Sequence, residues 1–451
     1  MSQPVRLSGD LSVTGVVMIT ASSVSPASSI FVIAPLAIAS AGSGALLSFA
    51  LAAVIAVCLA LCYAEVGTAH PSAGGEYVIA RRVFGPLSGV QTYLFGLGGS
   101  LFIPAVLAVG AIPYLNTALG CHLSAARAGA VTVLIGGGCA LLNIRASALI
   151  TGLFLLLEML VLILLAWLGL SQPHQTAAIF IHPQMLNNGG ALTAVTLPVV
   201  VAMVGTALFS YNGYGSAITL AEDMAQQGRP MARAVLYTLL VVVAVELIPF
   251  AALLIGAPSL AVLTAQADPI GYVLNQLGGP MLSRAVAGII YLAVFNAIIA
   301  TVTQCSRVVF SSGRDGFWLP AINRALSGIA PRSGAPWVAT LLFSLISALL
   351  AFDSGLDELT SFTVILLLLV YLLVATAALF SRLGKIHHPW RMPLWPLPAL
   401  VAVLACLYVL GSLLTVTPLR DYLAILGLMA VGIALNAWHQ RRRTPPPFRG
   451  E

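Results

Sequence analysis

Apolar runs long enough to cross a lipid bilayer recur along this chain of 451 residues. The runs at 149–168 and 363–379 contain very few polar side chains. A helix needs about 20 apolar residues to span the hydrocarbon core of a bilayer. A membrane barrel would instead show short segments of alternating polarity, because lumen-facing and lipid-facing residues alternate along each strand. The pattern therefore predicts an all-α polytopic membrane protein.

Composition agrees with lipid as the main solvent of the surface. Hydrophobic residues make up 59% of the chain and charged residues only 8%, whereas soluble domains are about one-quarter charged. The six cysteines are scattered without a CxxC pair, which is typical of small buried residues. We expect no metal site and no cofactor. The first apolar run continues into the body of the protein, so we expect a retained helix and no cleavable signal peptide.

The apolar runs predict twelve transmembrane helices, with boundaries good to about four residues. The first six are expected at residues 14–39, 44–68, 88–117, 126–143, 147–171 and 191–221. The second six are expected at residues 234–256, 282–312, 335–352, 360–382, 393–415 and 421–439. An even number of spans places both termini on the same side of the membrane.

The basic residues indicate which side that is. Lys and Arg concentrate in the cytoplasmic loops of membrane proteins. Of the 20 basic residues, 17 fall in the segments on the side of the termini, and only Arg127, Arg284 and Arg420 fall on the other. We therefore predict a multi-pass protein of the plasma membrane with both termini in the cytoplasm. This asymmetry accounts for the basic charge balance, and nothing in the sequence indicates nucleic acid as a partner.

Two of the expected helices carry polar interruptions. The first contains Pro26 within a serine-rich stretch, and the sixth contains Gly213 and Gly215 beside Asn212. Proline removes a helix hydrogen bond, and closely spaced glycines lower the cost of unwinding. Broken helices at corresponding positions five helices apart are typical of transporters built from inverted repeats. The alternative is a simple proline kink and a glycine patch for helix packing.

The inverted-repeat interpretation divides the chain into five parts. Residues 1–13 form a cytoplasmic N-terminus and residues 440–451 a cytoplasmic tail. Residues 14–171 form the first inverted repeat and residues 191–382 the second, while residues 393–439 form two additional helices.

Three motifs then suggest a family. The first runs from Tyr63 to Gly67 and continues through 71–77 to 84–86. The second comprises residues 211–214, 221–223 and 229–234, and the third residues 306–308, 313–316 and 319–320. In order and spacing they resemble the signatures of amino acid permeases of the amino acid–polyamine–organocation superfamily. The resemblance implies a LeuT-like fold with a 5+5 inverted repeat, discontinuous helices 1 and 6, and two C-terminal helices.

The first break departs from the family pattern. Amino acid permeases usually carry a glycine-rich stretch where this chain has residues 25–29, and the glycines let backbone N–H groups approach a substrate carboxylate. Here Pro26 offers no N–H group. Ala27, Ser28 and Ser29 still do, and serine hydroxyls can donate as well. Recognition of a carboxylate is therefore expected, and a substrate without one, such as an amine, is the alternative.

Unwound segments present the ends of half-helices, where free N–H groups suit an anion and free carbonyls suit a cation. We predict that a zwitterionic amino acid bridges the two breaks. Its carboxylate would meet the donors of Ala27, Ser28 and Ser29. Its ammonium group would meet carbonyls around Ser25 and at residues 211–213.

Further residues are expected to shape this pocket. Asn212 and Gly213 belong to the sixth-helix break, and Tyr211, Tyr214 and Tyr93 could line or cap the cavity. Ordinary packing is the alternative for each tyrosine. Neither break contains a carboxylate, which favours a neutral or small substrate over a cationic one.

Two acids lie within predicted spans, Glu158 in the fifth helix and Glu246 in the seventh. An ionisable residue at the centre of the bilayer is costly and usually faces protein or a water-filled cavity. We expect proton coupling, with Glu158 as the main candidate and Glu246 as the second. A lysine couples protons at a similar position of the fifth helix in some members of the family. The alternative for both acids is neutral, hydrogen-bonded packing.

Sodium coupling is the rival to proton coupling. It would need oxygen ligands from the first and eighth helices, and the eighth offers Asn296, Thr301 and Thr303. Hydroxyls on membrane helices more often bond to their own backbone. We therefore expect H+ before Na+ as the coupling ion.

The sequence thus predicts a secondary active transporter of amino acids or related amines that works by alternating access, with proton symport as the leading mode. Exchange against an internal metabolite is the first alternative, and an amino acid sensor that transports nothing is another. An enzyme is not expected, because no histidine lies within a clear helix core to form a metal cluster or a nucleophile–base pair. The expected partners are a small-molecule substrate and membrane lipid, and the oligomeric state is left open.

Overall fold

The computed structural model describes residues 12–72, 74–141, 147–187, 189–224, 228–314, 316–330, 335–383 and 387–441. The terminal segments predicted at 1–13 and 440–451 lie almost entirely outside these residues. Within them the protein is helical apart from one short hairpin. Nine helical segments of this part of the chain are long and apolar enough to cross a membrane. The prediction of a polytopic helical membrane protein is thereby confirmed.

The expected number of twelve spans stays a prediction, because three of them are not resolved as separate long helices. The first candidate span covers Val13–Ala69, 57 residues that contain both of the first two expected helices. The helices expected at 126–143 and 335–352 are present as shorter apolar helices, α7 (Ala125–Ala140) and α16 (Trp337–Asp353).

The first candidate span is divided by two backbone turns. It consists of α1 (Val13–Val24), α2 (Pro26–Ser28), the π-helical turn η1 (Ser29–Ile33), α3 (Ala34–Ala41), the turn η2 (Gly42–Gly44) and α4 (Ala45–Ala69). Ser25 adopts the left-handed conformation, with φ 50° and ψ 73°. Gly42 has φ 55°, and a Cβ atom there would lie 2.1 Å from the carbonyl oxygen of Gln184. Both turns therefore end helices that would otherwise run on.

The remaining elements follow in order along the chain. After α4 come α5 (Glu76–Phe84), α6 (Pro86–Leu119), α7, α8 (Ser147–Ser171), α9 (Ala178–Ile181), β1 (Gln184–Leu186), β2 (Leu192–Ala194), α10 (Leu197–Ala202), α11 (Val204–Ser210) and the 3₁₀ segment η3 (Tyr214–Asp223). The second half contains α12 (Arg229–Gly256), α13 (Leu260–Ala265), α14 (Pro269–Arg314), α15 (Pro320–Leu326), α16, α17 (Leu356–Ser381), α18 (Leu397–Val416) and α19 (Leu419–Arg441).

The span expected at 191–221 begins later than predicted, whereas its end agrees with the candidate span Leu197–Leu220. Its first residues form β2, which pairs antiparallel with β1 in the register Met185 with Thr193, and helix begins only at Leu197, where Pro198 occupies the first turn. The α-helical part ends at Ser210, after which the chain turns and continues as η3. The helix expected at 282–312 corresponds to the part of α14 that follows Gly279, whose non-helical conformation (φ 83°) separates it from the preceding helix that begins at Pro269.

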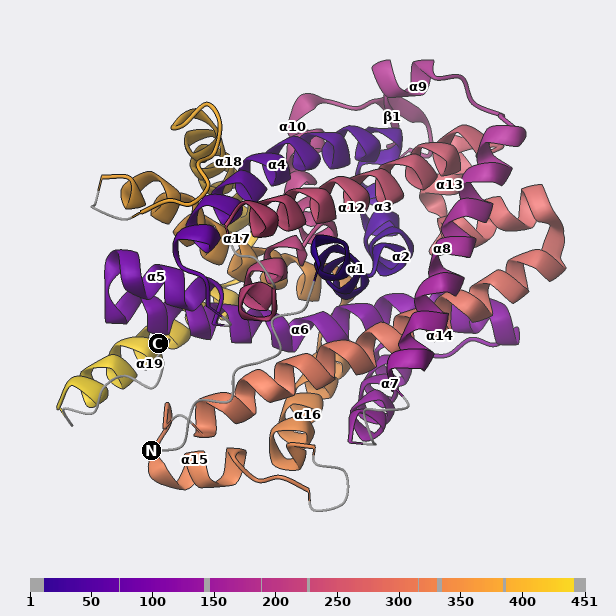
Figure 1. The fold of residues 1–451 in the computed structure, drawn as a ribbon. Coiled ribbons are helices and arrows are strands. Elements are labelled where there is room, and N and C mark those ends of the chain that lie inside the picture. The colour runs from indigo at the N-terminus through magenta and orange to yellow at the C-terminus, as the bar shows by residue number, and fades with distance from the viewer. Residues whose placement is uncertain are drawn as a thin grey trace.

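The broken helix α1–α3 lies in the interior of the bundle. α1 and α2 are near the middle of the view in Figure 1, between α12 and α6. α12 packs against α1, α4 and α8, while α6 packs against α14 and α17. At 34 residues α6 is about 51 Å long, which exceeds the roughly 30 Å hydrocarbon core. The longest helices therefore surround the segment that carries the first break.

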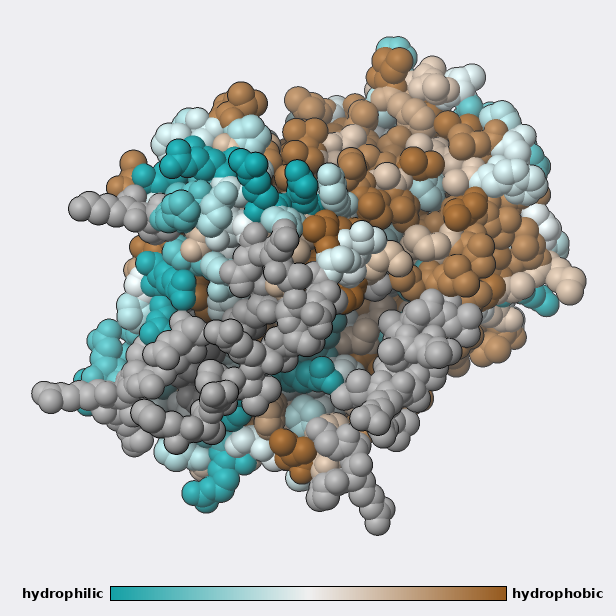
Figure 2. Space-filling model, viewed as in Figure 1, coloured by the Kyte–Doolittle hydropathy of each residue, from teal (hydrophilic) through white to brown (hydrophobic). Residues whose placement is uncertain are grey.

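The surface divides by polarity. Figure 2 shows hydrophobic side chains over the right-hand part of the view and hydrophilic ones gathered on the left, where α5 lies. A belt of apolar side chains next to a polar end suits a protein whose helices are surrounded by lipid.

Candidate functional site

The first helix break places two serine hydroxyls on a buried acid. Ser25 Oγ donates to Glu158 Oε1 of α8 at 3.1 Å, and it lies 2.8 Å from Ser28 Oγ. A hydroxyl has one proton to donate, so with Glu158 ionised Ser28 donates to Ser25 while Ser25 donates to Glu158. The three side chains form one directed chain of hydrogen bonds that ends on the carboxylate.

The second break is bonded to the first. Ser210, the last residue of α11, donates from Oγ to Glu246 Oε2 of α12 at 2.6 Å. Its carbonyl oxygen accepts a hydrogen bond from Ser29 Oγ at 2.8 Å. Beyond it Gly213 has φ 124°, and a Cβ atom there would lie 2.8 Å from Cγ2 of Val24. The two breaks therefore touch through backbone as well as through side chains.

A cavity of about 260 Å³ lies at the two breaks. It is lined by serine hydroxyls from the first break, by residues of the second break and by apolar side chains of α6 and α11. Its lining includes Ser25, Ser28, Ser29, Ser210, Asn212, Gly213, Ser216, Ile103, Leu107, Phe209, Thr301 and Gln304.

A second cavity of about 300 Å³ adjoins the first and extends toward α5. The two share the side chains of Tyr63, Glu76, Asn212, Cys305 and Tyr371, among others. We call the first the central cavity and the second the vestibule. The central cavity therefore continues toward one end of the molecule, the end at which α5 lies.

Six of the nine predicted substrate-binding residues face these cavities. Ser25, Ser28, Ser29, Asn212 and Gly213 line the central cavity. Tyr93 lines the vestibule.

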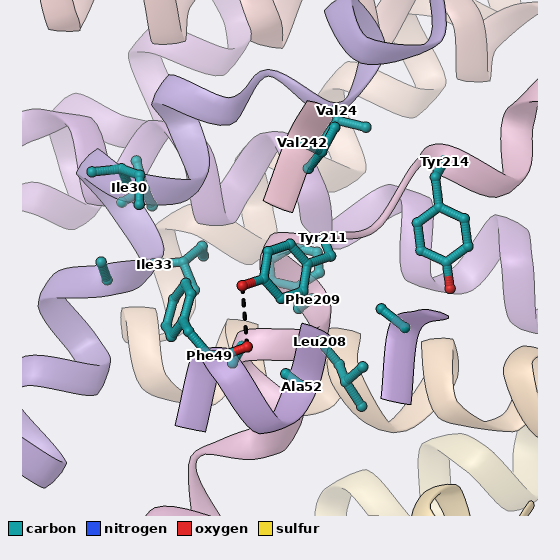
Figure 3. Packing of buried hydrophobic residues seen from close by; sticks show 14 of the residues in the cluster. Val24, Ile30, Ile33, Phe49, Ala52, Leu208, Phe209, Tyr211, Tyr214 and Val242 are labelled. Atoms are coloured by element: carbon teal, nitrogen blue, oxygen red, sulfur yellow. Dashed lines mark hydrogen bonds between the residues drawn. The ribbon is translucent and has the colours of Figure 1, made fainter. Parts of the chain in front are cut away.

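Three predicted residues face neither cavity. Ala27 is fully buried beside them. Tyr211 turns away, since its hydroxyl donates to the carbonyl of Phe49 at 3.1 Å and its ring meets the Phe49 ring edge-on at 6.0 Å. Figure 3 shows this contact, with Tyr214 lying apart from it. The ring of Tyr214 packs on Tyr63, with 5.8 Å between centroids.

Some of the donors that were predicted to bind a carboxylate already form hydrogen bonds within the protein. The N–H group of Ser29 donates to the carbonyl of Ser25 at 3.2 Å, and its hydroxyl is bonded to Ser210. The Ser28 hydroxyl is engaged with Ser25. Any carboxylate bound here must take over hydroxyl groups that are now bonded to protein.

Tyr63, Glu76 and Tyr371 face both cavities and are absent from the predicted set. Tyr371 Oη donates to Asn212 Oδ1 at 3.2 Å, and Tyr63 Oη donates to Glu76 Oε1 at 3.3 Å. Burial raises the pKa of the Glu76 carboxyl above its usual range. Glu76 and Tyr63 lie within the first motif, which was a signal for them, whereas nothing distinguishes Tyr371 from its apolar neighbours.

The three expected sodium ligands do not face one common site in the structure. Thr301 lines the central cavity. Thr303 Oγ1 donates instead to the backbone carbonyl of Ile299 at 2.7 Å, as hydroxyls on helices commonly do. Asn296 does not line either cavity.

The sequence matches the family described as amino acid permease over residues 11–431. A branched-chain amino acid permease of Bacillus subtilis is 25% identical, with 92% of this chain and 90% of the relative covered. A branched-chain amino acid permease of Lactococcus lactis is 27% identical, with 80% of each chain covered. A serine/threonine exchanger of Bacillus subtilis is 25% identical, with 85% of each chain covered.

These similarities extend over the chain that holds both helix breaks and all three motifs. Because the family match runs over nearly the whole sequence, this chain belongs to the amino acid permeases of the amino acid–polyamine–organocation superfamily.

Proposed function

We propose that this protein is a secondary active transporter that carries a neutral amino acid across the plasma membrane by alternating access. The observation that carries the proposal is the central cavity, which lies where two broken helices meet. Discontinuous helices present both N–H and carbonyl ends to a substrate. Two of the relatives are permeases for branched-chain amino acids and one is an exchanger for serine and threonine, which are neutral, whereas a cationic amino acid transporter of Homo sapiens is also similar, at 24% identity.

The proposed topology has twelve spans, two inverted repeats of five helices each and both termini in the cytoplasm. The nine candidate spans support it, since one of them contains a second span and α7 and α16 supply two more apolar helices. The 17-to-3 distribution of basic residues supports the orientation. In this orientation α5 and the vestibule lie on the cytoplasmic side.

The proposed pose places the substrate carboxylate against the first break. Ser25 and Ser28 offer hydroxyl groups there, and the ammonium group points to the oxygen-rich second break around Asn212. An apolar side chain would contact Ile103 and Phe209. Among the described residues that line the central cavity, the only charged side chain is that of Glu76, which comes from α5 and not from either break.

The chain of hydrogen bonds from Ser28 to Glu158 supports proton coupling. With Glu158 ionised, the protons run from Ser28 to Ser25 to Glu158. Ser28 then presents a lone pair to the substrate, which repels a carboxylate. A proton on Glu158 reverses the direction, so that Ser28 Oγ–H points into the cavity and donates to the substrate. Proton binding and carboxylate binding therefore favour each other, which is the condition for symport.

Glu158→Gln tests this coupling because glutamine keeps the shape and can always donate to Ser25. We expect counterflow in proteoliposomes to continue while uptake loses its dependence on pH and no longer concentrates substrate. Glu246→Gln tests the second coupling candidate in the same way, and Glu358→Gln, an acid paired with Arg420, is the control that should keep the wild-type pH profile. A wild-type pH profile in Glu158→Gln would contradict proton coupling through this residue.

Exchange is the second candidate, and one relative is itself an exchanger. An exchanger would take up labelled amino acid only into vesicles preloaded with substrate, whereas a symporter also responds to an imposed pH gradient. Absence of counterflow for every neutral amino acid would reject transport and leave the sensor as the alternative.

A further inference from the structure

The vestibule contains a carboxylate without a counter-ion. Glu76, the first residue of α5, lines both the vestibule and the central cavity. Among the described residues that line them, it is the only acid, and no Lys, Arg or His lines either. Its Oε1 accepts a hydrogen bond from Tyr63, and no cation of the described chain forms an ion pair with it.

Aromatic rings form much of the wall around this acid. Tyr63 and Tyr371 meet edge-on with 6.0 Å between centroids, and Tyr77 and Tyr93 do so at 6.1 Å. All four line the vestibule. The faces of aromatic rings attract cations, and an isolated, partly buried carboxylate is costly until a proton or a cation compensates it. Tyrosine rings around a single carboxylate are the chemistry that recognises an organic ammonium group.

We propose that the vestibule is a second binding subsite, specific for the ammonium group of an organic amine or of an amino acid, with Glu76 as its anionic ligand. The central cavity binds a carboxylate through hydroxyl groups, whereas the vestibule needs only the ammonium group. The inference rests on the proposed function only where it names amino acids as one source of that group.

The position of Glu76 between the cavities gives the subsite a role. An amino acid that leaves the breaks toward α5 passes Asn212 and then Tyr63 and Glu76, because these residues belong to both cavities. The ammonium group would thus exchange one set of oxygen partners for another without losing both at once. Amines without a carboxylate would bind at Glu76 and block this route.

Isothermal titration of the purified protein at neutral pH with n-butylamine tests the subsite directly. This amine is L-norvaline without its carboxylate, and 1-butanol is its uncharged counterpart. We expect the wild type to bind n-butylamine but not 1-butanol. Glu76→Gln should weaken amine binding at least tenfold, and Glu76→Asp should restore it to within about threefold. Glu358→Gln is the matched control and should bind n-butylamine as the wild type does. Glu358 lies in the first turn of α17, where it pairs with Arg420.

A second readout avoids any change at Glu76. Cys305 lines both cavities, so in a protein whose other five cysteines are replaced by alanine, n-butylamine should slow its modification by a thiol reagent and 1-butanol should not. Equal amine affinity in wild type and Glu76→Gln, or no protection of Cys305, would overturn the proposal.

The two sources of the ammonium group are separated by competition. L-Norvaline that displaces n-butylamine supports passage of amino acids through the vestibule, and failure to displace it overturns that part. Norvaline counterflow without amine binding would reject the subsite and keep the transporter. Glu76-dependent amine binding without counterflow would reject the transporter and keep the subsite.

Discussion

Glu65 is fully buried where α4 ends, and Arg382 at the end of α17 neutralises it. Arg382 Nε lies 2.5 Å from Oε1 and Nη2 lies 3.0 Å from Oε2, a bidentate pair. The N–H group of Met392 donates to Oε2 at 3.2 Å, and the guanidinium lies 5.0 Å from the centroid of the Trp395 ring. One acid therefore joins α4, α17 and the segment before α18.

Removing one partner of this pair should be costly, because the other charge is left buried without compensation. We expect Glu65→Gln to lower the free energy of unfolding by about 3–5 kcal/mol, measured by denaturant titration in detergent. Asp353→Asn is the control: its pair with Arg420 is exposed, and such pairs contribute about 0–1 kcal/mol. A cost for Glu65→Gln no larger than the control's would show that the pair does not hold these helices together.

At the scale of the element, the two broken helices depend on each other. The turn after α11 places Gly213 against Val24 at the end of α1, and Ser29 bonds to the carbonyl of Ser210. The sequence indicated both breaks through Pro26 and through closely spaced glycines. It did not indicate that they would touch, because contacts between distant segments depend on how the intervening helices pack.

Gly213→Ala tests this contact. A side chain at φ 124° is strained, and the added Cβ would lie 2.8 Å from Val24. We expect uptake by proteoliposomes to fall at least tenfold while the protein still elutes as a single folded species. Gly411→Ala on α18 has open space at the Cβ position and should transport as the wild type does. Normal uptake by Gly213→Ala would mean that the breaks do not need this close approach.

At the scale of the whole molecule, the two ends contain different cavities. The central cavity opens into the vestibule near α5, whereas a separate cavity of about 510 Å³ lies further along, around Phe31 and Tyr114. Between them η1 packs closely on α6, since a Cβ atom on Gly110 would lie 2.3 Å from Val32. This packing separates the central cavity from the cavity around Phe31, and in the proposed alternating-access cycle it would correspond to a state closed on that side.

Labelling from the two sides of the membrane checks this state and the orientation together. In a protein that keeps only Cys305, a membrane-impermeant thiol reagent should react at least tenfold faster in inside-out vesicles than in right-side-out ones. A protein that keeps only Cys121, which follows α6 at the opposite end, should show the reverse preference. Faster reaction of Cys305 from the outside would contradict the accessible side or the predicted orientation.

Much of the molecule follows from local pattern. Apolar runs about 20 residues long determine that the chain crosses membranes as helices, because backbone groups cannot stay unpaired in hydrocarbon. Pro26 and the glycines near Asn212 determine where helices break, because both act on the backbone within one turn. The start of the sixth helix could not be predicted in this way, because residues 192–194 are compatible with helix but pair as a strand with β1.

The sequence by itself therefore determined that the protein is a polytopic helical membrane protein, its family and the approximate place of the cavity at the two breaks. The tertiary structure alone decided which side chains face the cavities: it turned Tyr211 toward Phe49 and brought Tyr371 and Glu76 into them. The direction of a side chain around a helix depends on which neighbours the helix packs against. In lipid nearly every face of a helix is apolar, so the pattern along the sequence does not mark the inward one.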